Sequence, residues 1–186
     1  MNEMQLIKTN LDGVYRIKAF YSEDNRGFFL KDYDQNFYIN NGLESNIHEC
    51  FESTSYKNVI RGIHFQLYNP QAKLVRVVNG NIFDVVVDLR PNSPTLGKWE
   101  GFYLSSEEAD SIYVPKGFGH GFAVSSNIAT VSYKCFGEYI KEYDSGIVWN
   151  DKVLGINWAI ENPVISKRDA ALMTFSEYYA LSNTMY

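Results

Sequence analysis

The sequence of 186 residues predicts an all-β fold, an antiparallel β-sandwich of the jelly-roll type with a short helix near the C-terminus. Apolar residues alternate with a period of two along most of the chain, which indicates strands. Turn-forming residues recur about every 8–12 positions, the spacing typical of sandwiches and barrels. Aromatic residues, which favour strands, make up 16% of the chain. We expect residues 1–186 to form a single domain, because this length buries a substantial core without disulfides or metals.

The predicted strands cover residues 14–20, 27–33, 58–66, 74–78, 82–87, 101–104, 111–114, 122–125 and 130–136. Asn79-Gly80 separates two β-branched runs and predicts a hairpin with a type I′ turn, in which both central residues adopt positive φ. Residues 168–181 lack Gly and Pro and contain Ala-Ala-Leu-Met, so they predict the C-terminal helix.

Charge and hydropathy exclude several classes of protein. The net charge of −5 argues against a nucleic-acid-binding protein, which usually presents a basic surface. No run of about 18 apolar residues predicts a membrane span, and the N-terminus lacks the features of a signal peptide. Cys50 and Cys135 are too few for a disulfide framework and have no zinc-site spacing. We therefore expect a cytoplasmic protein with reduced thiols.

The stretch from Arg61 to Gln66 places three polar side chains in a strand that otherwise resembles a core strand. In a regular strand Arg61 and His64 point to opposite faces. A bulge at Gly62 would turn both toward the same side and into a polar cavity. The alternative is an exposed edge strand with solvated polar residues, and the spacing alone leaves both interpretations open.

Two further polar features lie in apolar surroundings. Asp84 and Asp88 share one face of a valine-rich strand, where a buried carboxylate needs a histidine or a cation as its partner. A solvent-exposed face is the alternative, and it suits Asp88 better than Asp84. His120 lies among three glycines, so we expect the backbone to bend tightly there. The His-x-His pair of a mononuclear metal site is absent, and we predict no metal.

Considered together, these segments resemble the dTDP-4-dehydrorhamnose 3,5-epimerase family, whose members have the cupin form of the jelly roll. The matching motifs run in the family's order from Gly13 to Asp169. They are Asp24-x-Arg26-Gly27-x-Phe29, Arg61 to Gln66, Gln71 to Val75, Phe83 to Arg90, Ser93-Pro94-Thr95-x-Gly97, Pro115 to Phe122, Tyr133-Lys134-Cys135, Trp149-Asn150-Asp151 and Ile165 to Asp169.

The resemblance implies proton abstraction beside the ketone of a nucleotide-linked 4-keto-6-deoxy sugar. It makes His64 the base, Asp169 the carboxylate that orients it, Tyr133 the acid, and Lys73 the cation that stabilises the enolate. Taken singly, Asp169 would be an ordinary residue in the first turn of a helix, Tyr133 a packing residue and Lys73 a surface charge. The residues implied to bind substrate are Arg26, Phe29, Ser53, Arg61, Gln66, Asp84, His120, Tyr139, Asp144 and Arg168.

The resemblance also implies a homodimer with exchanged strands, in which Arg26 and Phe29 reach the partner's nucleotide. No cofactor is implied, and no nucleotide-cofactor motif is present. Lys31 replaces a usual Glu, and Glu49 with Phe51 replaces a usual Gln and Asn, while the implied catalytic set is complete. Because of these departures, CDP-, GDP- and UDP-linked sugars are alternative substrates to the dTDP-linked sugar.

Three alternatives to a 3,5-epimerase stay open on this sequence. The same residues would serve a mono-epimerase that inverts C3 or C5 only. A cupin of this kind can also bind a sugar nucleotide without catalysis. The third alternative is a metal-dependent cupin oxygenase or isomerase, with His64 and His120 as metal ligands.

Overall fold

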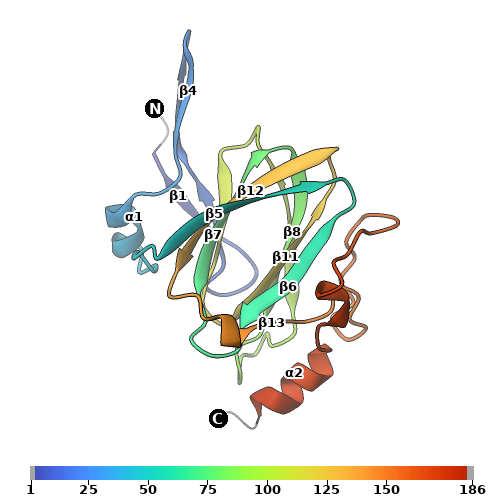
Figure 1. The fold of residues 1–186 in the computed structure, drawn as a ribbon. Coiled ribbons are helices and arrows are strands. Elements are labelled where there is room, and N and C mark those ends of the chain that lie inside the picture. Colours follow the sequence, from blue (N-terminus) through green and yellow to red (C-terminus); the bar gives the residue numbers. More distant parts are fainter. Residues whose placement is uncertain (1–2, 184–186) are drawn as a thin grey trace.

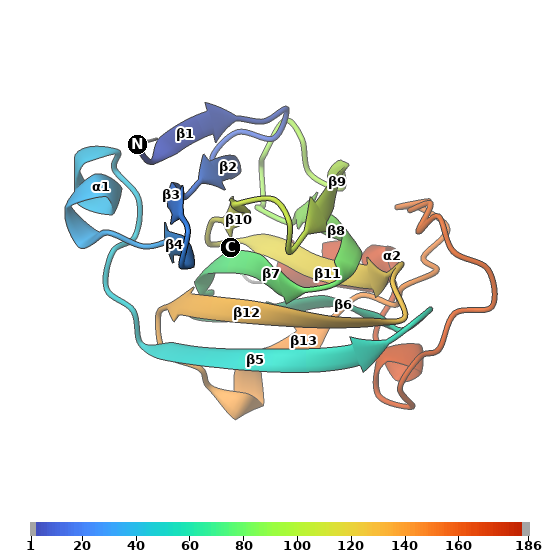
Figure 2. The ribbon, with the colours of Figure 1, turned by 90° about the horizontal axis from the view of Figure 1, so that it is seen from above.

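The computed structural model describes residues 3–183 and consists of two antiparallel sheets packed face to face (Figures 1 and 2). The six-stranded sheet has the order β1 (Gln5–Lys8), β2 (Tyr15–Lys18), β10 (Asp110–Val114), β7 (Ala72–Asn79), β12 (Ile128–Phe136) and β5 (Glu49–Tyr56). The five-stranded sheet has the order β13 (Asp144–Gly146), β6 (Ile60–Gln66), β11 (Phe118–Val124), β8 (Asn81–Asp88) and β9 (Trp99–Ser105). The predicted all-β antiparallel sandwich is confirmed.

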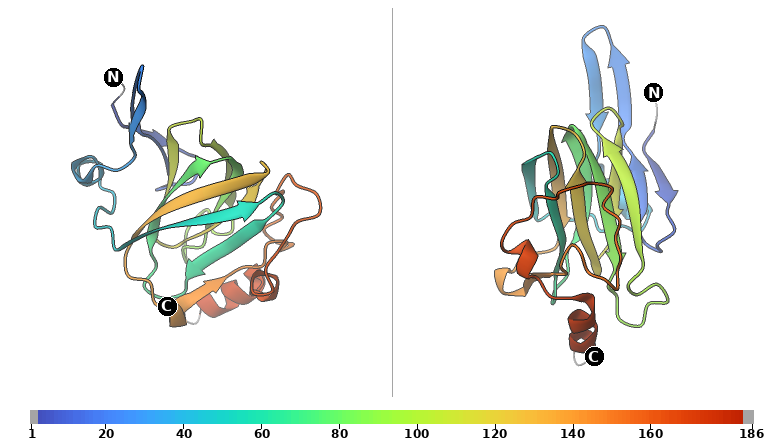
Figure 3. Two further views of the ribbon diagram at one scale, coloured as in Figure 1. Left: turned by 45° about the horizontal axis from the view of Figure 1, so that its top comes forward. Right: turned by 90° about the vertical axis from the view of Figure 1, so that its right-hand side faces the viewer.

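A separate hairpin of β3 (Phe20–Asp24) and β4 (Gly27–Lys31) stands clear of the sandwich (Figure 3). The predicted strand over residues 14–20 is wrong in extent, because β2 ends at Lys18 and the chain then leaves the sheet. Ala19 donates its backbone N–H to Ala109, and the next residues form the projecting hairpin. Helix α1 (Gln35–Asn40) follows β4 and begins after the N-cap Asp34, whose carboxylate accepts a hydrogen bond from the Phe37 N–H.

The hairpin predicted around Asn79-Gly80 is wrong. Strand β7 pairs with β10 and β12, whereas β8 pairs with β11 and β9, so the chain crosses from one sheet to the other at this point. Gly80 has a φ of 78°, but Asn79 is not left-handed, which excludes the type I′ turn. Each strand is central in its own sheet and largely buried, so each needs partners on both edges. A Cβ at Gly80 would lie 2.1 Å from the Ile128 carbonyl oxygen, so the crossing requires glycine.

The predicted C-terminal helix over residues 168–181 is confirmed only in its second half. Helix α2 (Phe175–Ser182) begins after Thr174, which forms a capping box with Glu177. Before it, Met173 makes a parallel bridge with Ile147, which keeps the backbone extended. The short 3-10 helices η1 (Lys141–Tyr143) and η2 (Asp169–Ala171) complete the elements. The C-terminal segment packs on the outer face of the five-stranded sheet (Figure 3).

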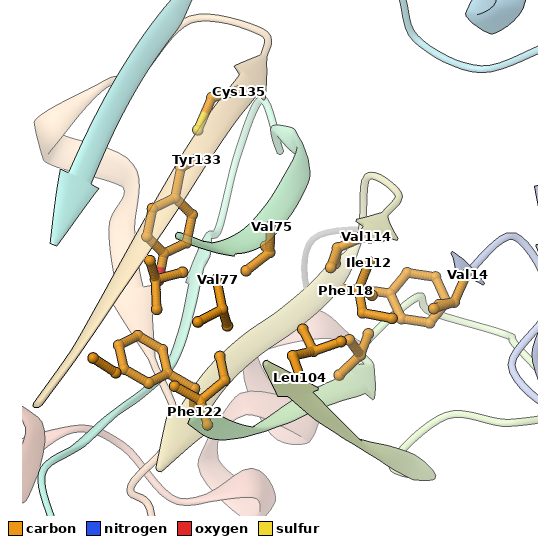
Figure 4. Packing of buried hydrophobic residues seen from close by; sticks show 14 of the residues in the cluster. Val14, Val75, Val77, Leu104, Ile112, Val114, Phe118, Phe122, Tyr133 and Cys135 are labelled. Atoms are coloured by element: carbon orange, nitrogen blue, oxygen red, sulfur yellow. The ribbon is translucent and has the colours of Figure 1, made fainter. Parts of the chain in front are cut away.

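The space between the sheets holds an apolar cluster at one end and polar side chains at the other. In Figure 4, Tyr133 and Cys135 of β12 lie in one cluster with Val75, Val77 and Phe122. A second cluster lies under the C-terminal segment, and a third packs α1 against the six-stranded sheet. Within residues 3–183, no helix is long and apolar enough to cross a membrane.

Candidate active site

A histidine and a carboxylate that are far apart in sequence meet at the polar end of the sandwich. His64 on β6 places Nε2 2.9 Å from Oδ1 of Asp169, which η2 carries. The Gly62 N–H donates to the other carboxylate oxygen at 3.3 Å. Burial alone would raise the pKa of Asp169, but the hydrogen bonds and the His64 charge hold it below its ordinary value. The ionised carboxylate fixes the proton on Nε2 and leaves Nδ1 as the nitrogen that accepts a proton.

The bulge predicted at Gly62 is confirmed. The register of β6 and β11 shifts between His120 and Phe122, so Gly62 and Ile63 lie opposite one residue. Gly62 has a φ of 134°, and a Cβ there would lie 2.5 Å from the Gly121 Cα, so a side chain would break this contact. The extra residue turns the Arg61 side chain inward as well, where its Nε donates to the buried Ser55 hydroxyl on β5 at 2.8 Å.

A second histidine–carboxylate pair lies deeper. His120 on β11 places Nε2 2.7 Å from Oδ1 of Asp84 on β8, and both side chains are buried. The other Asp84 oxygen is buried without a hydrogen-bond partner among the described residues. The tight bend expected around His120 is wrong, because residues 118–124 form a continuous strand. Gly119 and Gly121 instead let β6 approach, since a Cβ at either would fall within 3.0 Å of Ile63.

Tyr133 reaches the interior from β12, on the sheet that faces His64. Its ring stacks on Phe51 at a centroid distance of 4.7 Å and lies edge-on to His120 at 6.0 Å. Burial, and then the charge of Asp84, raise the pKa of Tyr133 far above its ordinary value, while Ser53 and Arg61 oppose the shift. The phenol is therefore protonated throughout the neutral range and is available as a proton donor.

Lys73 lies on β7, directly opposite Cys135 of β12. Burial lowers the pKa of the Lys73 amine, and the neighbouring Cys135, Asp144 and Glu49 oppose that shift. Tyr133 and Lys73 thus lie on the sheet that faces the strand of His64.

The predicted rim residues form a connected group. Asp144 on β13 accepts hydrogen bonds from Arg168 at 2.7 Å and from the exposed Tyr139 hydroxyl at 3.2 Å. The Gln66 amide donates to the Asn69 and Glu138 carbonyls, and its oxygen accepts the Ile140 N–H. Gln66 therefore holds the backbone that precedes β13, and its predicted role in substrate binding stays a prediction.

Two predicted residues are not gathered with the dyad in a single chain. Arg26 and Phe29 lie on the projecting hairpin, where Arg26 pairs with Asp24 at 2.6 Å and Phe29 packs on Phe20. Lys31, at the end of the same hairpin, pairs with Asp34 at 2.7 Å. Ser53 lies on β5, where its buried hydroxyl acts on the Tyr133 phenol and opposes the rise of its pKa.

Sequence reasoning missed two residues that shape the site. Ser55 holds the Arg61 guanidinium, and Phe51 covers the Tyr133 ring. Both lie on β5, a strand that was not predicted because its inward residues include Glu49, Ser53 and Ser55. The available signal for this strand was the alternation of small polar residues, which is a weak indicator of a strand. In the part of the chain that the structure describes, no group of three or more His, Cys, Asp or Glu is placed to hold a metal.

Comparison with known proteins gives one family. The family model described as dTDP-4-dehydrorhamnose 3,5-epimerase matches residues 8–177. A protein of that name from Methanothermobacter thermautotrophicus is 45% identical over 172 residues, which cover 91% of this chain and 93% of the relative. The crystal structure of a dTDP-6-deoxy-D-glucose-3,5-epimerase from Legionella pneumophila in complex with dTDP-4-keto-L-rhamnose is 38% identical, with a TM-score of 0.90 over 94% of both chains.

A more distant solved structure is a 3′-monoepimerase from Streptomyces bikiniensis in complex with dTDP-quinovose. It is 27% identical, with a TM-score of 0.89, and the match covers 95% of this chain and 90% of that chain. These likenesses agree with the antiparallel two-sheet architecture, which is the cupin form of the jelly roll. The chain belongs to the dTDP-4-dehydrorhamnose 3,5-epimerase family.

Proposed function

We propose that the protein is an isomerase that inverts C3 and C5 of dTDP-4-keto-6-deoxyglucose to give dTDP-4-keto-L-rhamnose. The observation that carries this is the His64–Asp169 pair at 2.9 Å, with a protonated phenol and a lysine on the inward face of the facing sheet. Family membership, and the dTDP-4-keto-L-rhamnose bound by the Legionella relative, support this substrate.

In the proposed reaction, His64 Nδ1 takes the proton from the carbon beside the C4 ketone. The electron pair of that C–H bond forms the enolate, and Asp169 stabilises the resulting imidazolium. Lys73, together with Arg61, stabilises the negative charge on the enolate oxygen. Tyr133 then returns a proton to the opposite face of the same carbon, which inverts the centre. The tyrosinate and the imidazolium exchange protons with solvent before the next turnover.

The remaining predicted residues hold the substrate in this proposal. His120, oriented by Asp84, contacts the sugar from the floor of the site, and Ser53 and Gln66 line the approach. Tyr139 stacks on the nucleobase, with Asp144 and Arg168 beside it at the rim. The exposed hairpin supports a homodimer with exchanged strands, in which Arg26 and Phe29 reach the partner's nucleotide.

We further propose a single domain over residues 1–186, since both sheets share one apolar cluster. A cytoplasmic location is proposed as well, and the two free cysteines support it.

The test is incubation with the dTDP-, CDP-, GDP- and UDP-linked 4-keto-6-deoxy sugars in D₂O, followed by NMR. We expect deuterium at C3 and C5 of the dTDP sugar, with inversion at both carbons. Deuterium and inversion at one carbon only would identify a mono-epimerase, the activity of the Streptomyces relative. No deuterium in any sugar, with the enzyme in excess, would identify a binding protein without catalysis. Stoichiometric metal in the purified protein, lost on replacing His64 or His120, would overturn the proposal in favour of metal chemistry.

A further inference from the structure

Three inward-facing residues form a row across neighbouring strands of the six-stranded sheet. Glu49 of β5 lies directly opposite Cys135 of β12, and Cys135 lies directly opposite Lys73 of β7. Residues opposite one another in an antiparallel sheet point to the same face. Cys135 belongs to the interior cluster (Figure 4), so the strand register places Glu49 and Lys73 on the same inward face. The row therefore places the Glu49 carboxylate in register with Lys73, whose amine the proposed mechanism uses.

Burial lowers the pKa of the Lys73 amine, and negative neighbours counteract that shift. The titratable groups that act on it come from three elements: Cys135 of β12, Asp144 of β13 and Glu49 of β5. Burial, more than any neighbour, raises the pKa of the Cys135 thiol to about 11, so the thiol is neutral at pH 7.

The two carboxylates differ in what already binds them. Asp144 is paired with the Arg168 guanidinium at 2.7 Å, so a neighbouring cation already offsets its charge. Glu49 Oε1 accepts a hydrogen bond from the neutral Gln71 amide at 3.2 Å. That amide also donates to the Gly137 carbonyl at 2.8 Å, which fixes it in place beside the row. Unlike Asp144, Glu49 is bound by a neutral amide and so keeps its full negative charge.

We propose that Glu49 is a positioning residue, which supplies the counter-charge that keeps the Lys73 amine protonated for the reaction. The inference rests on the proposed function, in which an ammonium group stabilises the enolate oxygen. A neutral amine in the same place would offer a much weaker electrostatic partner to that oxygen. Glu49 acts through Lys73, and it is not itself required to touch the sugar.

The test variant is Glu49→Gln, which keeps the shape of the side chain and an oxygen for the Gln71 amide but removes the charge. Glu52→Gln is the matched control. It removes one negative charge from the same strand at an exposed position on the opposite face, where Glu52 lies across from Ser132. Lysines are ¹³C-methylated and titrated by NMR, and Lys73→Arg identifies the Lys73 signal by its loss. The pH profile of kcat is then measured for the same proteins.

We expect the Lys73 midpoint to fall by about one pH unit in Glu49→Gln and to stay within about 0.2 units of wild type in Glu52→Gln. The alkaline limb of the kcat profile should move down by the same amount, while KM at pH 7 stays within about twofold. An unchanged Lys73 midpoint in Glu49→Gln would overturn the inference, and a rise in KM alone would instead assign Glu49 to nucleotide binding.

The titration is read without substrate, so it separates this inference from the proposed function. A shifted midpoint in a protein that is inactive on every ketosugar would refute the proposed function and leave the pairing of Glu49 with Lys73 intact.

Discussion

In the proposed reaction, the His64 imidazole can serve as the base because its Nε2 is already bound to Asp169. Asp169 is held by the Gly62 N–H, and its own N–H donates to the Ser166 hydroxyl at 3.0 Å, so the carboxylate has a fixed direction. This fixes the imidazole tautomer and leaves Nδ1 to the substrate. The depressed pKa of Asp169 keeps the carboxylate ionised across the neutral range, so the pair is intact wherever the enzyme is expected to work.

In the proposed reaction Tyr133 acts from the facing sheet, so its replacement should separate proton abstraction from inversion. Tyr133→Phe removes the donor and keeps the ring that stacks on Phe51. We expect inversion to fall by roughly 10²-fold, while deuterium exchange at the carbon that His64 deprotonates falls by much less. Both rates are read from one NMR time course in D₂O. Equal losses of exchange and inversion would show that Tyr133 is not a dedicated donor.

At the scale of the elements, the loop that follows β8 depends on Asp88. This fully buried carboxylate accepts hydrogen bonds from Arg90 at 2.7 Å and from Ser93 and Thr95 at 2.6 Å. Burial opposes ionisation of Asp88, but the hydrogen bonds outweigh it and lower the pKa of Asp88 to about 2.

Asp88→Asn should therefore lower the free energy of unfolding at pH 7 by about 2 kcal/mol. A depressed carboxyl pKa stabilises the fold above the unfolded value, near pH 4, and that stabilisation disappears as the pH falls toward 2. The difference between wild type and Asp88→Asn in urea unfolding should thus shrink below pH 4. Glu107→Gln, an exposed carboxylate, is the control expected to show no such pH-dependent difference. A difference that is as large at pH 2.5 as at pH 7 would contradict the assignment.

Local patterns in the sequence located most strands but not their partners. The β-branched runs of β7 and β8 marked two strands correctly, yet pairing depends on which neighbours are available in the folded sheet. The Asn-Gly signal therefore predicted a hairpin where the chain changes sheets. Strand β5 and helix α1 were missed because neither shows a clear apolar period.

The site was predictable only in part from local signals. The bulge at Gly62 and the partner of Asp84 follow from polar residues within apolar strands. The solvent-exposed face that suited Asp88 better is wrong, because Asp88 is fully buried and bound by Arg90. The pairing of His64 with Asp169 spans 105 positions, and no periodicity links them. That pair came from resemblance to the family. The row of Glu49, Cys135 and Lys73 exists only once three strands are in register, so it was not predictable from the sequence.

At the scale of the whole molecule, the contacts within one chain do not explain why the projecting β3–β4 hairpin exposes aromatic residues. Phe28 and Phe29 are 66% and 61% exposed, which is unusual for two adjacent aromatic residues. The proposed exchanged dimer gives them a place in the partner's site. We expect Arg26→Ala and His64→Ala to be weakly active when each is purified alone.

A heterodimer of these two variants, isolated with two affinity tags, tests the exchange. It contains one site with His64 from one chain and Arg26 from the other, so about half of the wild-type activity should return. Without exchange both sites of the heterodimer stay defective. An inactive heterodimer, or a monomeric wild type by light scattering, would contradict the exchanged dimer.

The most direct measurement for the central claim compares wild type with His64→Ala on dTDP-4-keto-6-deoxyglucose in D₂O. Both proteins are followed by NMR at C3 and C5, with circular dichroism to show that each is folded. The account predicts that deuterium enters both carbons with wild type and that the rate falls by roughly 10²-fold or more in His64→Ala. Deuterium entry at near wild-type rates in a folded His64→Ala protein would contradict it.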